Sequence, residues 1–248
     1  MLDLGTHPGT LAALADPSHH RHAVQFYEDD AFLMDALAEF VARGLDAGRP
    51  VLVIATEAHR EALAGDLAAR GVEVARTRVS GQLTLLDARE VLDRFMVGGL
   101  PDEARFRGVV GEALDRALRV REGATVSAFG EMVDLLWKDG NPEGAIRLEA
   151  LWNELAASYS FSLLCGYAIG NFGRAGDTEA FARICGQHDH VVPTERYTRL
   201  DEDERLRGIT ALEQRAQALE GELAYQRELE RRRPRRRRPT RPRASSWP

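Results

Sequence analysis

Apolar residues along this chain alternate between short continuous runs and runs with helical spacing, beginning at His22. The run PVLVIAT at 50–56 is continuously apolar, which indicates a strand buried on both faces of a parallel sheet. Residues 29–47 place apolar side chains on one helical face, with Asp29 or Asp30 as the N-cap. Further strands are predicted at 22–27, 72–75, 83–87, 124–129 and 161–167, and further helices at 57–70, 88–96, 102–122, 131–138, 143–158 and 178–188.

Strands that alternate with helices of this length are typical of βαβ units. We therefore expect an α/β domain with a mostly parallel sheet of about five or six strands and helices on both faces. Gly98–Pro101 is predicted to break the pattern, and Phe161–Tyr167 is the last clear strand. The expected α/β domain covers residues 21–198, after a flexible lead-in at 1–20.

The C-terminal part of the chain has a different pattern. Ile209, Leu212, Ala216, Leu219 and Leu223 follow one another at spacings of three and four, which is the a/d seam of a coiled coil. Residues 199–230 are therefore predicted to form a signalling helix. It pairs with its copy in a homodimer through 205–226, or it folds back on the domain. Residues 231–248 read as a disordered Arg- and Pro-rich tail, or as an altered reading frame.

Charge is distributed unevenly along the 248 residues, whose net charge is −6. The segment 231–248 carries nine arginines, which leaves 24 basic against 39 acidic residues elsewhere. Such a body repels nucleic acid and anionic membranes, so only the tail is expected to attract nucleic acid. No apolar run approaches the roughly 20 residues of a membrane span, and no signal peptide is evident. We therefore expect a cytoplasmic protein that does not bind membranes.

Catalytic motifs are missing from this sequence. GxxxxGK[ST], a strand-linked GxGxxG and GxSxG are all absent, and Lys138 is the sole lysine. Glu28, Glu57 and Glu131 follow strands and read as first-turn helix residues rather than as acid–base pairs. Asp87 reads as a helix cap. We therefore expect no catalytic residue and no enzyme activity.

The two cysteines, Cys165 and Cys185, lie twenty positions apart and suit neither a disulfide framework nor a four-thiolate zinc site. Cys185, His188 and His190 match no zinc signature, and we interpret the two histidines as residues near a helix C-terminus. The sequence therefore predicts buried free thiols, with no metal site and no cofactor.

Aromatic residues cluster near the predicted strand ends and on the later helices. They form core packing, or they line a pocket for a small apolar or weakly polar effector. The residues concerned are Phe26, Tyr27, Phe129, Trp137, Trp152, Tyr167 and Phe172.

Four segments together resemble the MEDS sensory domain (methanogen/methylotroph, dichloromethane-regulator type). They are HAVQFYEDDAFLMDALAEFVARGLDAGRPVLVIAT at 22–56, FGEMVDLLWKDGNPEGAIRLEALWNEL at 129–155, FSLLCGYAIGNF at 161–172 and ICGQHDHVVPTERYT at 184–198. The resemblance implies a RecA/KaiC-like α/β fold without a working phosphate loop. It also implies a sensory input role, commonly joined to histidine kinases, PAS modules or DNA-binding regulators.

The resemblance further implies a ligand that is a small hydrocarbon derivative, or a signalling protein partner. Positions that match the family pattern are carried over as candidate ligand-binding or signalling residues. They are His22, Tyr27, Glu28, Asp29, Glu131, Trp152, Asn153, Cys165 and Tyr167. Kinase boxes and a helix-turn-helix are not evident after Thr198. Two alternatives remain open: a degenerate RecA-like nucleotide-binding protein and a structural interaction module.

Overall fold

A computed structural model describes residues 22–232, except 122 and 174–176. The predicted lead-in at 1–20 and residues 233–248 of the predicted tail lie outside the described residues. The described chain divides into two units, of which the first ends at Arg199 and the second begins at Leu200.

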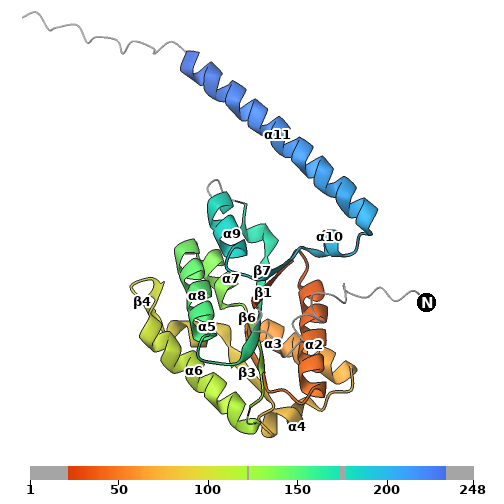
Figure 1. Ribbon diagram of the computed structural model, residues 1–248, viewed down its shortest axis with the longest axis vertical. Helices are drawn as coiled ribbons and strands as arrows, with labels where there is room; N and C mark the ends of the chain where they lie inside the picture. Colours follow the sequence, from red (N-terminus) through yellow and green to blue (C-terminus); the bar gives the residue numbers. More distant parts are fainter. Residues whose placement is uncertain (1–21, 122, 174–176, 233–248) are drawn as a thin grey trace, which may run out of the picture. The chain divides into compact units, whose positions relative to one another are not determined.

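Six strands in the described residues form one sheet, in the order β3-β2-β6-β7-β1-β8 (Figure 1). All five neighbouring pairs are parallel. The predicted α/β class and the predicted parallel sheet are therefore confirmed. The strands are β1 His22–Tyr27, β2 Val51–Ala55, β3 Leu83–Asp87, β6 Val126–Gly130, β7 Phe161–Ala168 and β8 His190–Val192.

Helices pack on both faces of the sheet (Figure 1). Side chains of α2 and α3 form one apolar core with the sheet, and side chains of α5 to α9 form the other. The helices of this unit are α2 Asp30–Asp46, α3 Glu57–Ala69, α4 Val74–Val79, α5 Ala88–Asp93, α6 Glu103–Val120, α7 Met132–Lys138, α8 Pro142–Leu155, α9 Asp177–Cys185, α10 Glu195–Thr198 and the 3₁₀ turn η1 Ile169–Asn171.

Alternation along the central strands assigns each side chain to one of the two cores. In β1, Val24 and Phe26 contact the α5–α9 core, whereas Ala23 and Tyr27 contact the α2–α3 core. This is the side-chain period of two that any strand imposes. The sequence of β1 therefore decides that His22 lies on the α5–α9 face.

The order of the strands places a reversal of topology between β2 and β6. The chain runs from β2 outward to β3, and from β6 in the opposite direction to β7. In open parallel sheets, the carboxyl ends of the strands at such a reversal form a crevice. Thr56 and Glu131 follow the two strands that flank it here.

The prediction of a strand at Val72–Ala75 is wrong, because residues from Val74 onward form α4. Local backbone hydrogen bonds from Thr77 to Glu73 and from Ser80 to Arg76 satisfy this segment without a partner strand. The strand prediction rested on two β-branched residues, Val72 and Val74, and this weak strand preference does not outweigh the local hydrogen bonds of the helix.

The predicted break at Gly98–Pro101 contains a small antiparallel hairpin, formed by β4 Met96–Val97 and β5 Leu100–Pro101. Gly98 and Gly99 both adopt positive φ in its turn, a conformation that glycine adopts readily.

Two differences from the prediction lie near the end of the first unit. Helix α9 ends at Cys185, three residues before the predicted end, so His188 lies in the turn that follows. The three-residue strand β8 was not predicted, because so short a run shows no alternation and forms only by pairing with β1.

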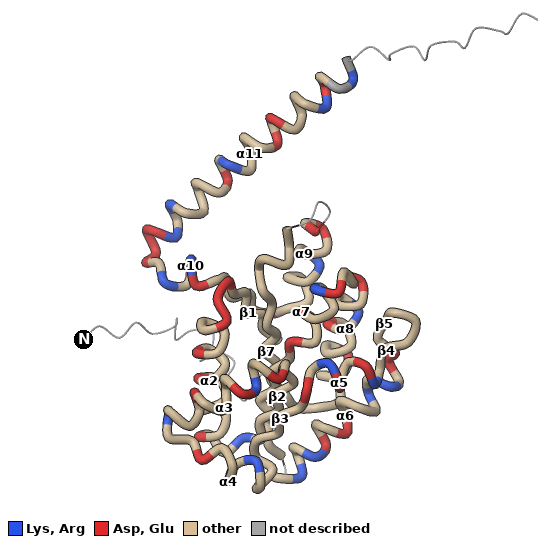
Figure 2. The backbone as a smooth tube through the Cα atoms, turned by 180° about the vertical axis from the view of Figure 1, so that it is seen from behind, with Lys and Arg blue, Asp and Glu red and all other residues tan. Residues whose placement is uncertain are grey.

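The second unit contains the helix α11, Glu202–Arg232, along which both signs of charge alternate (Figure 2). The predicted C-terminal helix is therefore confirmed. In the described part of the chain, no helix has both the length and the apolar character needed to cross a bilayer.

A buried cluster of histidine, cysteine and carboxylate

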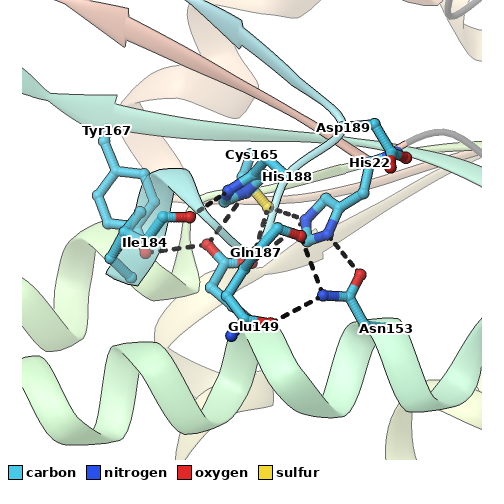
Figure 3. Close-up of polar contacts among 9 residues, drawn as sticks. All are labelled: His22, Glu149, Asn153, Cys165, Tyr167, Ile184, Gln187, His188 and Asp189. Carbon is cyan, nitrogen blue, oxygen red and sulfur yellow. Dashed lines mark hydrogen bonds and ion pairs between the residues drawn. The ribbon is translucent and has the colours of Figure 1, made fainter. Parts of the chain in front are cut away.

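Four side chains that can bind metal ions meet between the sheet and α8, on the α5–α9 face (Figure 3). His22 begins β1, Glu149 lies on α8, Cys165 lies in β7, and His188 lies in the turn after α9. The β1–β7 register pairs Val24 with Cys165, which leaves His22 on the same face two residues upstream. We call these four residues the buried cluster.

Glu149 is the centre of the buried cluster and has no exposed surface. One carboxylate oxygen, Oε1, accepts a hydrogen bond of 2.9 Å from the Tyr167 hydroxyl and lies 3.4 Å from His188 Nε2. The other, Oε2, lies 3.2 Å from His22 Nε2 and 3.5 Å from Cys165 Sγ. Each oxygen therefore has two neighbours.

The outer nitrogens of both imidazoles are held by acceptors outside the buried cluster (Figure 3). His188 Nδ1 lies 2.8 Å from the Ile184 carbonyl oxygen, which can only accept. His22 Nδ1 lies 2.9 Å from Asn153 Oδ1, and the Asn153 amide nitrogen donates to the Gln187 carbonyl. Both Nδ1 atoms therefore carry the proton, and both Nε2 atoms point inward.

The inward atoms are not fully satisfied by hydrogen bonds. In the described part of the chain, the buried side-chain atoms that have no hydrogen-bond partner are His188 Nε2 and Ser162 Oγ. The His188 side chain has no exposed surface. An unpartnered nitrogen so deeply buried is unusual in a native fold.

Charge within the buried cluster is strongly coupled. Burial alone would raise the pKa of Glu149, but His188 and His22 outweigh burial and lower that pKa. Burial lowers the pKa of His188, but Glu149 outweighs it and the net change is a raised pKa. Burial, together with Glu149, raises the pKa of the Cys165 thiol well above its usual range. The chain alone therefore favours a carboxylate, an imidazolium and a neutral thiol.

The structure brings together four of the nine candidate residues. His22 and Cys165 belong to the buried cluster, Asn153 holds His22, and Tyr167 donates to Glu149. Trp152 is buried in the core behind them, with its ring 5.3 Å from Phe106 and 5.6 Å from Phe161.

Tyr27, Glu28 and Asp29 lie away from the buried cluster. Tyr27 is buried on the α2–α3 face of the sheet. The backbone N–H groups of Glu28 and Asp29 donate to the Glu195 carboxylate, at 3.1 and 2.9 Å. The Asp29 side chain caps α2 by accepting from the Ala31 N–H.

Glu131 belongs to a second polar group, at the reversal of topology between β2 and β6. Its carboxylate is buried and accepts hydrogen bonds from the Thr56 N–H and from His59 Nδ1. His59 Nε2 lies 3.7 Å from Asp30. His59 therefore lies between two carboxylates, and the hydrogen bond to Glu131 raises its pKa despite burial.

The aromatic residues do not surround one common space. Phe172 contacts Phe26, Trp137, Tyr167 and Phe181, with ring centroids 4.3–5.7 Å apart. Phe129 and Tyr27 lie on the opposite face of the sheet. A cleft of about 550 Å³ lies beside α4 and contains none of the nine candidates. It is lined by Ala42, Leu45, Asp46, Arg70, Gly71, Val72, Glu73, Arg76, Thr77, Ser80 and Gln82.

Sequence reasoning did not single out Glu149 or His59, and it set His188 aside. One signal for Glu149 was present, because it is a carboxylate among the inward positions Ala145, Leu148 and Trp152 of an amphipathic helix. Charged residues on such a face are rarely buried without a partner. No comparable signal connects His188 with His22, which is 166 residues away in the sequence.

Replacing His59 with glutamine should lower stability in a pH-dependent way. Because the folded pKa of His59 is raised, its stabilisation is fully present below its unfolded pKa of about 6.5. It is lost as pH rises through the folded value. We expect a loss of about 1–3 kcal/mol in unfolding free energy at pH 6, shrinking above pH 7, in urea denaturation.

The matched control is a double-mutant cycle of His59→Gln with Glu131→Gln, because the coupling energy isolates the pair. A coupling energy that stays constant between pH 6 and pH 9 would contradict the prediction, because it would show that protonation of His59 does not strengthen its contact with Glu131.

Comparison with known proteins gives one match. The profile of MEDS, the methanogen/methylotroph, DcmR sensory domain, matches residues 21–188, a range that contains the whole buried cluster. No curated protein and no solved structure matches the chain. The match covers more than half of the 248 residues, and the chain therefore belongs to the MEDS family of sensory domains.

Proposed function

We propose that this chain is a non-catalytic input module of a cytoplasmic signalling pathway, in which a change at the buried cluster is passed to α11. The observation that carries the proposal is the course of residues 188–199. This segment begins in the buried cluster at His188, continues as β8 and α10, and ends at the boundary of the second unit. We call it the exit segment.

The first part of the exit segment is fastened to the strand that carries His22. The Asp189 N–H donates to the His22 carbonyl at 2.8 Å, and the His22 N–H donates to the Asp189 carboxylate at 3.0 Å. The strand β8 then pairs with residues 23–25 of β1. Displacement of His188 or His22 therefore acts directly on the pairing of β8.

The far part of the exit segment is fastened at the other end of β1. Glu195 accepts the two N–H bonds from Glu28 and Asp29, where β1 passes into α2. Arg199 lies over the ring of Phe32 in α2, at 5.7 Å from the ring centroid, which suits a cation–π contact. The exit segment thus spans the length of β1, with polar contacts at both ends.

These contacts support a two-state mechanism. A ligand can shift the docking of the exit segment only as far as it binds the docked and released states with different affinity. The polar contacts at its two ends are few, so a free-energy difference of a few kcal/mol is enough to redistribute the two states.

The family resemblance favours a small hydrocarbon derivative, or else a protein partner, as the signal. An apolar effector on the α5–α9 face would have to separate the ring contacts of Phe172 with Phe26 and Phe181, which fill that region. Such an effector would be separated from the buried cluster by a single residue, Tyr167, which contacts both Phe172 and Glu149.

Nucleotide binding is less well supported by the contacts at the strand ends. The N–H groups between β1 and α2 are already bonded to the Glu195 carboxylate, and Glu131 accepts the N–H at the start of α3. Glu28, Asp29 and Asp30 add negative charge there. A phosphate needs free N–H groups and positive charge, so these carboxylates oppose it.

For α11, we propose pairing with a second copy of the chain, which would give the module its output. Ile209, Leu212, Leu219 and Leu223 are 45–60% exposed in the single chain. Acidic and basic residues both occur along this helix (Figure 2). Most of the stability of a helix in a protein comes from the packing of its apolar face, and a second copy would cover the seam by the same a/d spacing.

Removing the Glu195 side chain should loosen the exit segment. In Glu195→Ala, the two charge-assisted hydrogen bonds to the end of β1 are lost, each worth about 1.5–3 kcal/mol. We expect amide hydrogen exchange in 190–198 to accelerate at least about tenfold, since 1.4 kcal/mol corresponds to a factor of ten. Mass spectrometry of the full chain measures this.

Glu202→Ala, in the first turn of α11, is the matched control and should leave exchange in 190–198 unchanged. If Glu195→Ala exchanges at the wild-type rate in 190–198, the exit segment is not held by this contact, and the proposed route of the signal fails.

Charge placed in the seam of α11 should prevent self-association. We expect the full chain to sediment as a dimer and the double variant Leu212→Glu with Leu219→Glu to sediment as a monomer, because four carboxylates would meet at the interface. Tyr225→Glu is the control, since Tyr225 is 65% exposed and lies off the seam. A wild-type monomer, or a double variant that remains dimeric, would rule out this interface.

A further inference from the structure

The buried cluster has the composition and spacing of a metal site rather than of a hydrogen-bonded core. All four candidate ligand atoms lie within 4.8 Å of one another. His22 Nε2, Cys165 Sγ and Glu149 Oε2 lie 3.2, 3.3 and 3.5 Å from one another, and His188 Nε2 lies 3.4 Å from the other carboxylate oxygen, Oε1. Ligand atoms of a tetrahedral zinc site, with bonds of about 2.0–2.3 Å, lie roughly 3.3–3.7 Å apart. The triangle of His22 Nε2, Cys165 Sγ and Glu149 Oε2 thus has the dimensions of one face of such a tetrahedron, and His188 Nε2 lies close enough to be the fourth ligand.

The direction of the donors also points to a cation. Because Asn153 and Ile184 accept the two Nδ1 protons, each imidazole turns its Nε2 toward Glu149 and Cys165. The buried carboxylate needs a positive charge beside it, and either a proton on one Nε2 or a cation bound by both Nε2 atoms supplies that charge. The need for a partner is clearest at His188 Nε2, which is buried and forms no hydrogen bond.

We propose that the buried cluster binds one divalent transition-metal ion of the zinc type, through one atom of each of its four side chains. The charges balance, because the carboxylate of Glu149 and a thiolate at Cys165 together neutralise a 2+ ion in a region closed to water. Binding releases the thiol proton of Cys165, since a coordinating thiol is deprotonated. The combination of thiolate and imidazole excludes Mg²⁺ and Ca²⁺, which prefer oxygen ligands.

The surrounding contacts match those of established metal sites. Ligating histidines usually donate their second nitrogen to a carbonyl or carboxylate, which fixes the ring. Ile184 does this for His188, and Asn153 does it for His22. The Tyr167 hydroxyl orients Glu149 from the side away from His22. A site with four protein ligands and almost no exposure to solvent has no open position for water, and it is therefore a structural metal site and not a catalytic one.

The proposal differs from the expectation drawn from sequence, which included no metal. The ligands come from residues 22, 149, 165 and 188, so no two of them fall within the short spacing of a zinc motif. The site does not depend on the proposed signalling role, because metal binding is measured directly.

Titration of the metal-free full chain with Co²⁺, the spectroscopic substitute for Zn²⁺, tests the proposal. We expect one equivalent to bind, with the intense visible bands of tetrahedral cobalt and a near-ultraviolet thiolate charge-transfer band, and Zn²⁺ to displace it. Cys165→Ser should lose the charge-transfer band and bind Co²⁺ at least about tenfold more weakly, whereas Cys185→Ser, the matched thiol control, should retain both.

Asn153→Ala gives a second, milder test, because it removes a positioning contact and no ligand. We expect Co²⁺ affinity to fall about 10- to 100-fold while the charge-transfer band persists. Should the Cys165 variant fail to fold, X-ray absorption on the zinc-loaded wild-type chain decides the matter, with one sulfur and three nitrogen or oxygen neighbours expected. Absence of stoichiometric binding, or a cobalt spectrum equal in Cys165→Ser and wild type, would overturn the proposal.

Discussion

A carboxylate with no exposed surface, Glu149, imposes the constraint on which the rest of this domain depends. An isolated charge in a protein interior costs many kcal/mol, so it persists only where donors or cations compensate it. Here the compensation comes from three elements that pack against α8, since β1, β7 and the turn after α9 each contribute side chains. The charge therefore links segments that are far apart in the sequence, and it links them in the middle of the core.

This link explains how a short and weakly paired strand such as β8 finds its place. The strand has three residues and lies at the edge of the sheet, beside β1. His188 reaches Glu149 immediately before β8, and Glu195 holds the end of β1 immediately after it. In the proposed function, a change at the buried cluster would act on one end of the segment that leads toward α11.

Much of the fold can be predicted from the sequence, because the patterns that indicate strands and helices are local. The apolar run of β2 and the one-sided apolar faces of α2 and α6 are visible without any tertiary contact. The site is only partly visible. Strand alternation and the family resemblance indicate His22 and Cys165, but the meeting of His188 with Glu149 depends on where α9 ends and how β8 pairs. These are tertiary outcomes that no spacing along the chain encodes, whereas the wrong prediction at α4 came from too weak a local signal.

Hydrogen exchange of the wild-type chain, with and without Zn²⁺, addresses most directly whether the buried cluster controls the exit segment. An ion that joins His188 to His22 should slow exchange at the Asp189 amide and across 190–198, while exchange in α4, on the far side of the sheet, stays the same. Unchanged exchange across 189–198 in a chain shown to hold one equivalent of zinc would contradict this coupling, even though the metal site itself would stand.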